Sequence, residues 1–189
     1  MQQSGPIPAP NTVSPAPRQR KPSRSRPVPA EPVPDEPIAL MIVGARDSGR
    51  DGVLGALLDA PGPLLERPAG SYLAVTYGHS RDVCAYVPGN RQPQPFAPPL
   101  PGEESGARPP RRIELTLPNP LLRHFALVDT PDAERLSAAG TRILLDAAVR
   151  GGAVLYVISA GHRLEPAEIT LLGELYRAGV YLFFALTPA

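Results

Sequence analysis

The chain has 189 residues, of which 42% are hydrophobic and 20% charged, and its formal net charge is +1 at pH 7. This size suits one domain with a tail, and the near-neutral charge gives no reason to expect a specific nucleic-acid partner. No apolar run reaches the roughly 18 residues of a membrane-spanning helix, and the N-terminus lacks the apolar core of a secretory signal peptide. The single cysteine, Cys84, excludes an internal disulfide and fits a reducing compartment. The sequence therefore predicts a cytoplasmic protein.

Residues 1–37 form a tail that carries eleven of the 27 prolines. Proline at this density removes backbone donors and blocks helices, which predicts a disordered or polyproline-like segment. The tail also contains a basic cluster of five residues: Arg18, Arg20, Lys21, Arg24 and Arg26. Two interpretations stay open, a solvated linker and an electrostatic tether to acidic lipid, RNA or a partner.

The first half of the remaining chain predicts strands around one helix. Residues 38–43 are almost all apolar, as in a strand buried on both faces, and a helix is expected over 51–60, ending at a Pro-Gly-Pro sequence. Residues 72–77 predict a strand, with 83–87 as its hairpin partner. The eight prolines of 88–110 predict a flexible surface insertion off the core.

The second half alternates strands and helices. Strands are expected at 113–117, 125–128, 153–158 and 180–186, and helices over 138–150 and from Pro166 to Gly179. The helix faces expected to point inward carry Ile143, Leu144 and Ala147 in the first helix, and Ile169, Leu172, Leu175 and Tyr176 in the second. This order predicts an α/β fold, a mostly parallel sheet with helices on both faces. Ligands of such sheets bind at the carboxyl ends of the strands.

One loop stands at such a strand end and begins the first helix: Gly44, Ala45, Arg46, Asp47, Ser48, Gly49, Arg50 and Asp51. A buried strand, two glycines five residues apart and a helix start are the context of a phosphate-binding P-loop, GxxxxGK[S/T]. The glycines are present, but Arg50 stands in place of the lysine and Asp51 in place of the hydroxyl residue.

Both replacements weaken the expected phosphate site. Arg50 keeps the positive charge, but its planar fork orients differently from a lysine ammonium. A carboxylate at Asp51, about 4 Å from a phosphate oxygen, would cost roughly 4 kcal/mol at an effective dielectric of about 20, unless Asp51 itself bound Mg²⁺. Asp129, at the end of a buried strand, is a second candidate for the Mg²⁺ shell, or else it caps the loop that follows.

The residues Leu127-Val128-Asp129-Thr130-Pro131, downstream of a GxxxxG loop, resemble the G domain of dynamin-like GTPases, especially the bacterial ones. The resemblance covers residues 38–189 and implies a P-loop GTPase-like domain that is incomplete at its C-terminus. It implies GTP or GDP and Mg²⁺ as cofactors. The residues that would bind them are the loop 44–51, then Asp129, Thr130, Pro131, Asp132 and Thr187, with Asp129 and Asp51 on the metal.

The chain departs from the family pattern at further positions. Asp132 replaces the glycine whose backbone N–H contacts the terminal phosphate, and Pro188 replaces the lysine of the base-reading motif that begins at Thr187. The threonine expected in the first switch cannot be assigned between Ser71 and Thr76.

Three hypotheses follow from the resemblance. In the first, a degenerate site binds and hydrolyses GTP weakly or not at all, and the chain pairs with an intact dynamin-like paralogue, or with itself, through the G-domain face in membrane remodelling. In the second it is an active GTPase, and in the third an interaction scaffold unrelated to membranes. The membrane would be reached indirectly or through regions beyond Ala189, which implies a peripheral position at the inner face.

Overall fold

The computed structural model describes residues 37–60, 62–68, 70–96 and 108–188. All of them lie in one compact unit of the chain. The tail with its basic cluster, up to residue 36, and the central part of the expected insertion, residues 97–107, lie outside the described residues.

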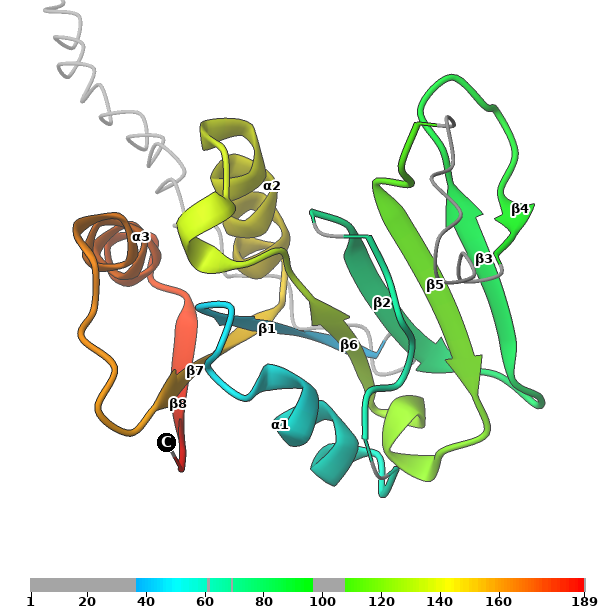
Figure 1. Cartoon of the computed structure of the whole chain (residues 1–189), viewed down its shortest axis with the longest axis horizontal. Helices are drawn as coiled ribbons and strands as arrows, with labels where there is room; N and C mark the ends of the chain where they lie inside the picture. The colour runs from blue at the N-terminus through cyan, green and yellow to red at the C-terminus, as the bar shows by residue number, and fades with distance from the viewer. Residues whose placement is uncertain (1–36, 61, 69, 97–107, 189) are drawn as a thin grey trace, which may run out of the picture. The chain divides into compact units, whose positions relative to one another are not determined.

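The described residues form one eight-stranded sheet in the order β4-β3-β5-β2-β6-β1-β7-β8 (Figure 1). The strands are β1 (Ile38–Gly44), β2 (Tyr72–Tyr77), β3 (Asp82–Tyr86), β4 (Gln94–Pro95), β5 (Arg112–Leu117), β6 (Phe125–Asp129), β7 (Ala153–Ser159) and β8 (Tyr181–Thr187). Neighbours β1–β6, β1–β7, β2–β5 and β7–β8 are parallel, and β2–β6, β3–β4 and β3–β5 are antiparallel. The predicted mostly parallel α/β sheet is confirmed.

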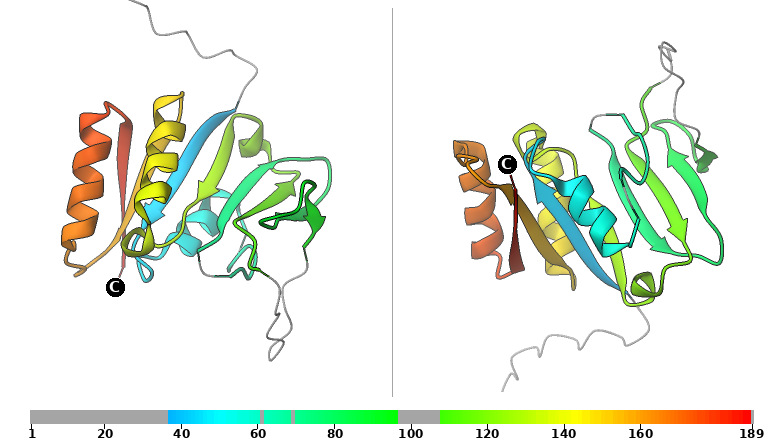
Figure 2. Two further views of the ribbon diagram at one scale, coloured as in Figure 1. Left: turned by 90° about the horizontal axis from the view of Figure 1, so that it is seen from above. Right: turned by 60° about the horizontal axis from the view of Figure 1, so that its bottom comes forward.

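Helices cover both faces of the sheet, as predicted. They are α1 (Arg50–Leu57), α2 (Ala138–Val149) and α3 (Pro166–Arg177), with two 3₁₀ turns, η1 (Pro120–Arg123) and η2 (Ala133–Arg135). Figure 2 shows α1 on one face and α2 and α3 on the other. The sheet has a hydrophobic core on each face, and strand β1 contributes to both because its side chains alternate. Ile42 packs on the α1 side, whereas Met41 and Val43 pack on the α2 and α3 side.

The first helix is shorter than predicted. It begins at Arg50 and ends at Leu57, three residues before the expected end. Asp59 adopts a left-handed backbone conformation with φ 52°, which a helix cannot continue through. The Pro-Gly-Pro sequence therefore follows the end of the helix and does not cause it.

The predicted hairpin of 72–77 with 83–87 is wrong. Strand β5 lies between β2 and β3, parallel to the former and antiparallel to the latter. Apolar and β-branched content identifies a strand but does not name its partner, and the turn at Gly78 suggested the nearer one. The described start of the expected insertion also belongs to the sheet, because β4 pairs with β3 and Phe96 packs against the core.

The inward faces of α2 and α3 differ from the prediction. Ile143, Ile169 and Tyr176 are exposed, and Tyr176 reaches 81%. The buried residues of α2 are Leu144 and Ala148, and those of α3 are Glu168, Leu171 and Leu175. In α3 the buried residues lie one position before the expected ones, which is a rotation of about 100° around the helix. Glu168 is therefore buried where Ile169 was expected to be.

Glu168 tolerates burial because its carboxylate is fully hydrogen-bonded. It accepts from the Tyr156 hydroxyl at 2.7 Å and from the Glu165 backbone N–H at 2.8 Å, and it lies 2.9 Å from Nε2 of His162. Burial is the largest influence on the pKa of Glu168 and raises it, but these hydrogen bonds together outweigh burial and the pKa is lowered. The network fixes the start of α3 on β7.

Within the described ranges, every helix is too short or too polar to cross a bilayer.

Candidate functional site

The carboxyl ends of β1 and β6 lie side by side and bring the loop 44–51 next to Asp129. The strands are parallel, with Ile42 opposite Asp129. Thr130 ties the two ends together, because its backbone N–H donates to the Ile42 carbonyl at 3.1 Å, and its hydroxyl donates either to the same carbonyl at 3.1 Å or to that of Pro131 at 3.0 Å. The sheet therefore places the two sequence motifs at one edge, as expected for this type of fold.

Both glycines of the loop are required by its geometry. A Cβ on Gly44 would lie 2.5 Å from the Val157 carbonyl oxygen, too close for any other residue. Gly49 precedes α1 with φ 79°, in the left-handed region that favours glycine. Between them, the Ser48 N–H donates to the Ala45 carbonyl at 3.2 Å and closes a turn. The loop therefore turns tightly between the end of β1 and the start of α1.

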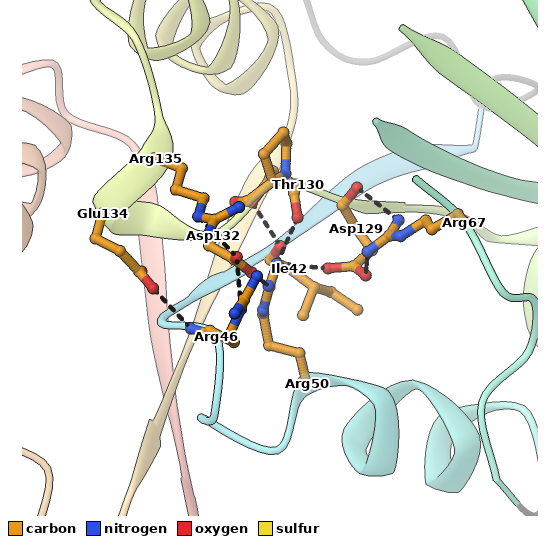
Figure 3. Close-up of polar contacts among 10 residues, drawn as sticks. Ile42, Arg46, Arg50, Arg67, Asp129, Thr130, Asp132, Glu134 and Arg135 are labelled. Carbon is orange, nitrogen blue, oxygen red and sulfur yellow. Dashed lines mark hydrogen bonds and ion pairs between the residues drawn. The ribbon is translucent and has the colours of Figure 1, made fainter. Parts of the chain in front are cut away.

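Arg50 crosses from this loop to the end of β6. It is the first residue of α1 and only 7% exposed. Its Nη1 donates to Oδ1 of Asp129 at 3.0 Å and to the Thr130 carbonyl, and its Nη2 donates to Oδ1 of Asp132 at 2.6 Å (Figure 3). One guanidinium thus binds three acceptors of the β6–η2 segment.

A second arginine, Arg67, reaches Asp129 from the segment between α1 and β2. Its Nη2 donates to Oδ2 of Asp129, and its Nη1 approaches the Asp129 carbonyl at 3.5 Å. The Asp129 residue is 1% exposed, and each of its carboxylate oxygens contacts a different guanidinium. The pKa of Asp129 is raised above its usual value, because burial raises it by more than the charges of Arg67 and Arg50 lower it.

Further contacts hold the η2 turn to the loop. The backbone N–H of Arg46 donates to Oε1 of Glu134 at 3.2 Å. The second oxygen of Asp132 lies 3.6 Å from Nε of Arg46 and 3.8 Å from Nε of Arg135. In a phosphate-binding loop, backbone N–H groups donate to the phosphate. Here the Arg46 N–H donates to the Glu134 carboxylate instead.

The remaining residues of the predicted site differ in exposure. Ala45 is half-buried and Pro131 buried, whereas Asp47 and Asp51 are exposed. Asp51 lies in the first turn of α1, where a carboxylate is favourable to the helix dipole. A cavity of about 550 Å³ opens beside the arginines and is lined by Asp51, the loop, residues 130–132 and part of the segment before β2. Ser71 lines this cavity, whereas Thr76 lies near the carboxyl end of β2, away from Leu73, which pairs with Asp129.

Thr187 joins the site through the loop backbone. Its hydroxyl lies 2.7 Å from the Ser48 carbonyl and 3.3 Å from the Ile158 carbonyl, so it donates to the loop or to β7. A Cβ on Gly49 would lie 3.1 Å from the Thr187 side chain. The end of β8 therefore packs directly on the loop.

No protein-family model and no curated protein matches the chain. The structure matches a solved structure described as "An oligomerised bacterial dynamin pair provides a mechanism for the long-range sensing and tethering of membranes", with a TM-score of 0.56 and 14% sequence identity. The described residues share the fold of the matched part of that bacterial dynamin. The match covers 80% of this chain and 25% of the dynamin chain, so the chain spans about a quarter of that protein's length.

A second structure of a bacterial dynamin pair, described in nearly the same words, matches at 11% identity over 80% of this chain and 31% of that chain. Its TM-score of 0.43 is too low to support an argument. At these identities, the comparison with bacterial dynamins establishes the fold alone.

Within this dynamin fold, two charged residues of the site carry no sequence pattern that identifies them. Arg67 lies 62 positions from Asp129 in a proline-flanked loop. Glu134 lies in a short turn outside any motif. Arg50 and Asp132 are easier to find from the sequence. Both depart from the pattern of dynamin-like GTPases, at positions where that pattern would face the same phosphates. Opposite charges at two such positions indicate that they pair with each other.

Proposed function

We propose that this chain is a dynamin-like protein in which side chains of the protein itself occupy the phosphate and metal end of the nucleotide site. It would bind and hydrolyse GTP weakly or not at all. It would act in membrane remodelling by pairing, through the face that carries this site, with an intact dynamin-like paralogue or with a second copy. The observation that carries the proposal is the bonding of Arg50 to Asp129, Thr130 and Asp132.

The residues present do not fit a bound Mg²⁺. A carboxylate serves the metal shell only when an oxygen faces the ion or its waters, and both oxygens of Asp129 face guanidinium groups. The loop offers no hydroxyl at Asp51. Two fixed positive charges on Asp129 also repel a divalent cation.

The residues fit a nucleotide phosphate equally poorly. Arg50 would have to leave both carboxylates to bind a phosphate, and Glu134 would have to release the Arg46 N–H. Breaking a buried ion pair costs about 3–5 kcal/mol. Since each 1.4 kcal/mol is a factor of ten in affinity, this cost alone weakens binding by roughly two to four orders of magnitude.

The pairing part of the proposal rests on the fold and on the fixed shape of this face. One solved structure with a similar fold is described as an oligomerised pair that provides a mechanism for the long-range sensing and tethering of membranes. If internal ion pairs fill the phosphate end of the site, the surface around it would keep the same shape with and without nucleotide. An active GTPase would instead need Arg50 to exchange its partners in each cycle, and no observation favours a scaffold unrelated to membranes.

Titration calorimetry combined with sedimentation velocity tests the proposal. GTP with Mg²⁺ is expected to give no heat of binding, or a Kd weaker than about 100 µM, equivalent to about −5.5 kcal/mol. The sedimentation coefficient of the chain is expected to rise with its concentration and to be unchanged by GTP, with ATP as the matched control. Submicromolar GTP binding, or association that requires GTP, would sink the proposal.

A further inference from the structure

The segment before β2 is joined to the end of β6 by one side chain. Arg67 donates both to the carboxylate and to the backbone carbonyl of Asp129. In Figure 3 the Arg67 side chain approaches Asp129 from the side opposite to Arg50. Within residues 62–68, 70–96 and 108–188, no other hydrogen bond or ion pair links 62–68 to β6.

The other anchors of this segment lie elsewhere. Leu64 is buried in the core on the α1 side, and its carbonyl accepts from Arg81 at 2.8 Å. After Arg67, the Ser71 N–H donates to the Pro68 carbonyl at 3.2 Å, which is a contact within the same connection. Glu66, beside Arg67, is exposed. Leu65 also packs against this core, so the first part of the segment has apolar anchors, whereas the polar link of residues 66–68 to β6 is the one that Arg67 makes.

Asp129 connects this contact to the loop 44–51. Its Oδ1 accepts from Arg50 and its Oδ2 from Arg67, so one buried carboxylate holds two guanidiniums that come from different segments. A change at one guanidinium alters the charge balance that the other experiences. The 550 Å³ cavity is lined by both arginines and by Asp132, so their positions define its walls.

We propose that Arg67 is a built-in latch, which holds the segment 62–68 against the end of β6 without any bound ligand and couples its position to Arg50 through Asp129. The latch fixes the cavity and the surface around it in one arrangement. This inference goes beyond the proposed function, because it concerns the mobility of a defined segment and is tested without nucleotide.

Residue-resolved amide exchange by NMR tests the latch on the full chain. In Arg67→Gln, the exchange rate of the Ser71 amide, which donates to the Pro68 carbonyl at 3.2 Å, is expected to rise about tenfold or more, since a charge-assisted hydrogen bond no longer opposes local opening of the segment. Arg67→Lys should restore part of the protection, because a lysine can keep one contact to Asp129. Arg91→Gln, an exposed arginine in the turn before β4, is the matched control and should leave the exchange rate of the Ser71 amide unchanged.

Asp129→Asn tests the coupling. It should raise the exchange of the Ser71 amide as Arg67→Gln does, and the two changes together should add nothing to either one. Unchanged protection in Arg67→Gln, or equal protection in the Gln and Lys variants, would overturn the latch. If Asp129→Asn does not fold, the comparison of Arg67→Gln with Arg67→Lys and Arg91→Gln still decides, because all three keep the buried carboxylate.

Discussion

Replacing Arg50 by alanine lowers the free energy of unfolding by about 3–5 kcal/mol, the range expected when a buried ion pair loses one partner. Arg50 is 7% exposed and is bound to two carboxylates and a carbonyl. Without it, Asp132 loses its closest cation and Asp129 keeps only Arg67. For a chain of this size, such a loss is a large part of the total stability.

Urea denaturation measures this effect, since guanidinium salts would screen the ion pairs under study. Arg142→Ala is the matched control, because Arg142 is exposed on α2 and outside the cluster. Its effect should stay within about 0.5 kcal/mol. A loss below about 1 kcal/mol in Arg50→Ala would mean that the guanidinium is not held by these carboxylates in solution.

Replacing Arg67 by glutamine is expected to destabilise the chain more at neutral pH than at acid pH. Burial already raises the pKa of Asp129, and Arg67 is the strongest influence that lowers it. Its removal therefore raises this pKa further. A carboxyl whose folded-state pKa exceeds the unfolded value of about 3.9 contributes its full stability below that value and loses it as the pH rises through the folded-state pKa.

The stability difference between wild type and Arg67→Gln should therefore be small near pH 4 and grow above it, to about 2 kcal/mol at pH 7.5. This is less than the about 3–5 kcal/mol of a fully broken buried pair, because Arg50 stays on Asp129. Groups that titrate equally in both proteins cancel in the difference. Thermal or urea unfolding at several pH values measures it, with Arg91→Gln as the control. A difference that is flat or shrinks as the pH rises contradicts the assignment.

Much of the fold is predictable because buried strands leave a direct record in the sequence. The apolar runs of β1, β6 and β7 identify central strands, and the glycines at 44 and 49 mark a loop that only glycine permits. The partner of β3 is not predictable in the same way. Its pairing with β5, which comes much later in the chain, depends on the arrangement of the whole sheet and not on the residue pattern of either strand.

The electrostatics of the site are harder to predict, because they depend on contacts between distant residues. Glu168 is tolerated inside because partners on other segments, among them the Tyr156 hydroxyl of β7, satisfy its carboxylate. Considered separately, Asp132 and Arg50 are defects of a nucleotide site, whereas together they form an ion pair. Arg67 has no local pattern at all, since its role depends on a carboxylate 62 positions away.

The central claim, that the chain's own ion pairs fill the phosphate end of the site, is tested most directly by restoring the missing residues. GTP with Mg²⁺ is titrated into wild type, into Arg50→Lys with Asp51→Ser, and into the same pair with Asp132→Gly. Calorimetry should show the weakest binding in wild type and a gain of about tenfold or more in the variants, since each broken ion pair removes over 1.4 kcal/mol of competition. If wild type binds GTP tightly, or if the folded triple variant binds no better than wild type, the account is contradicted.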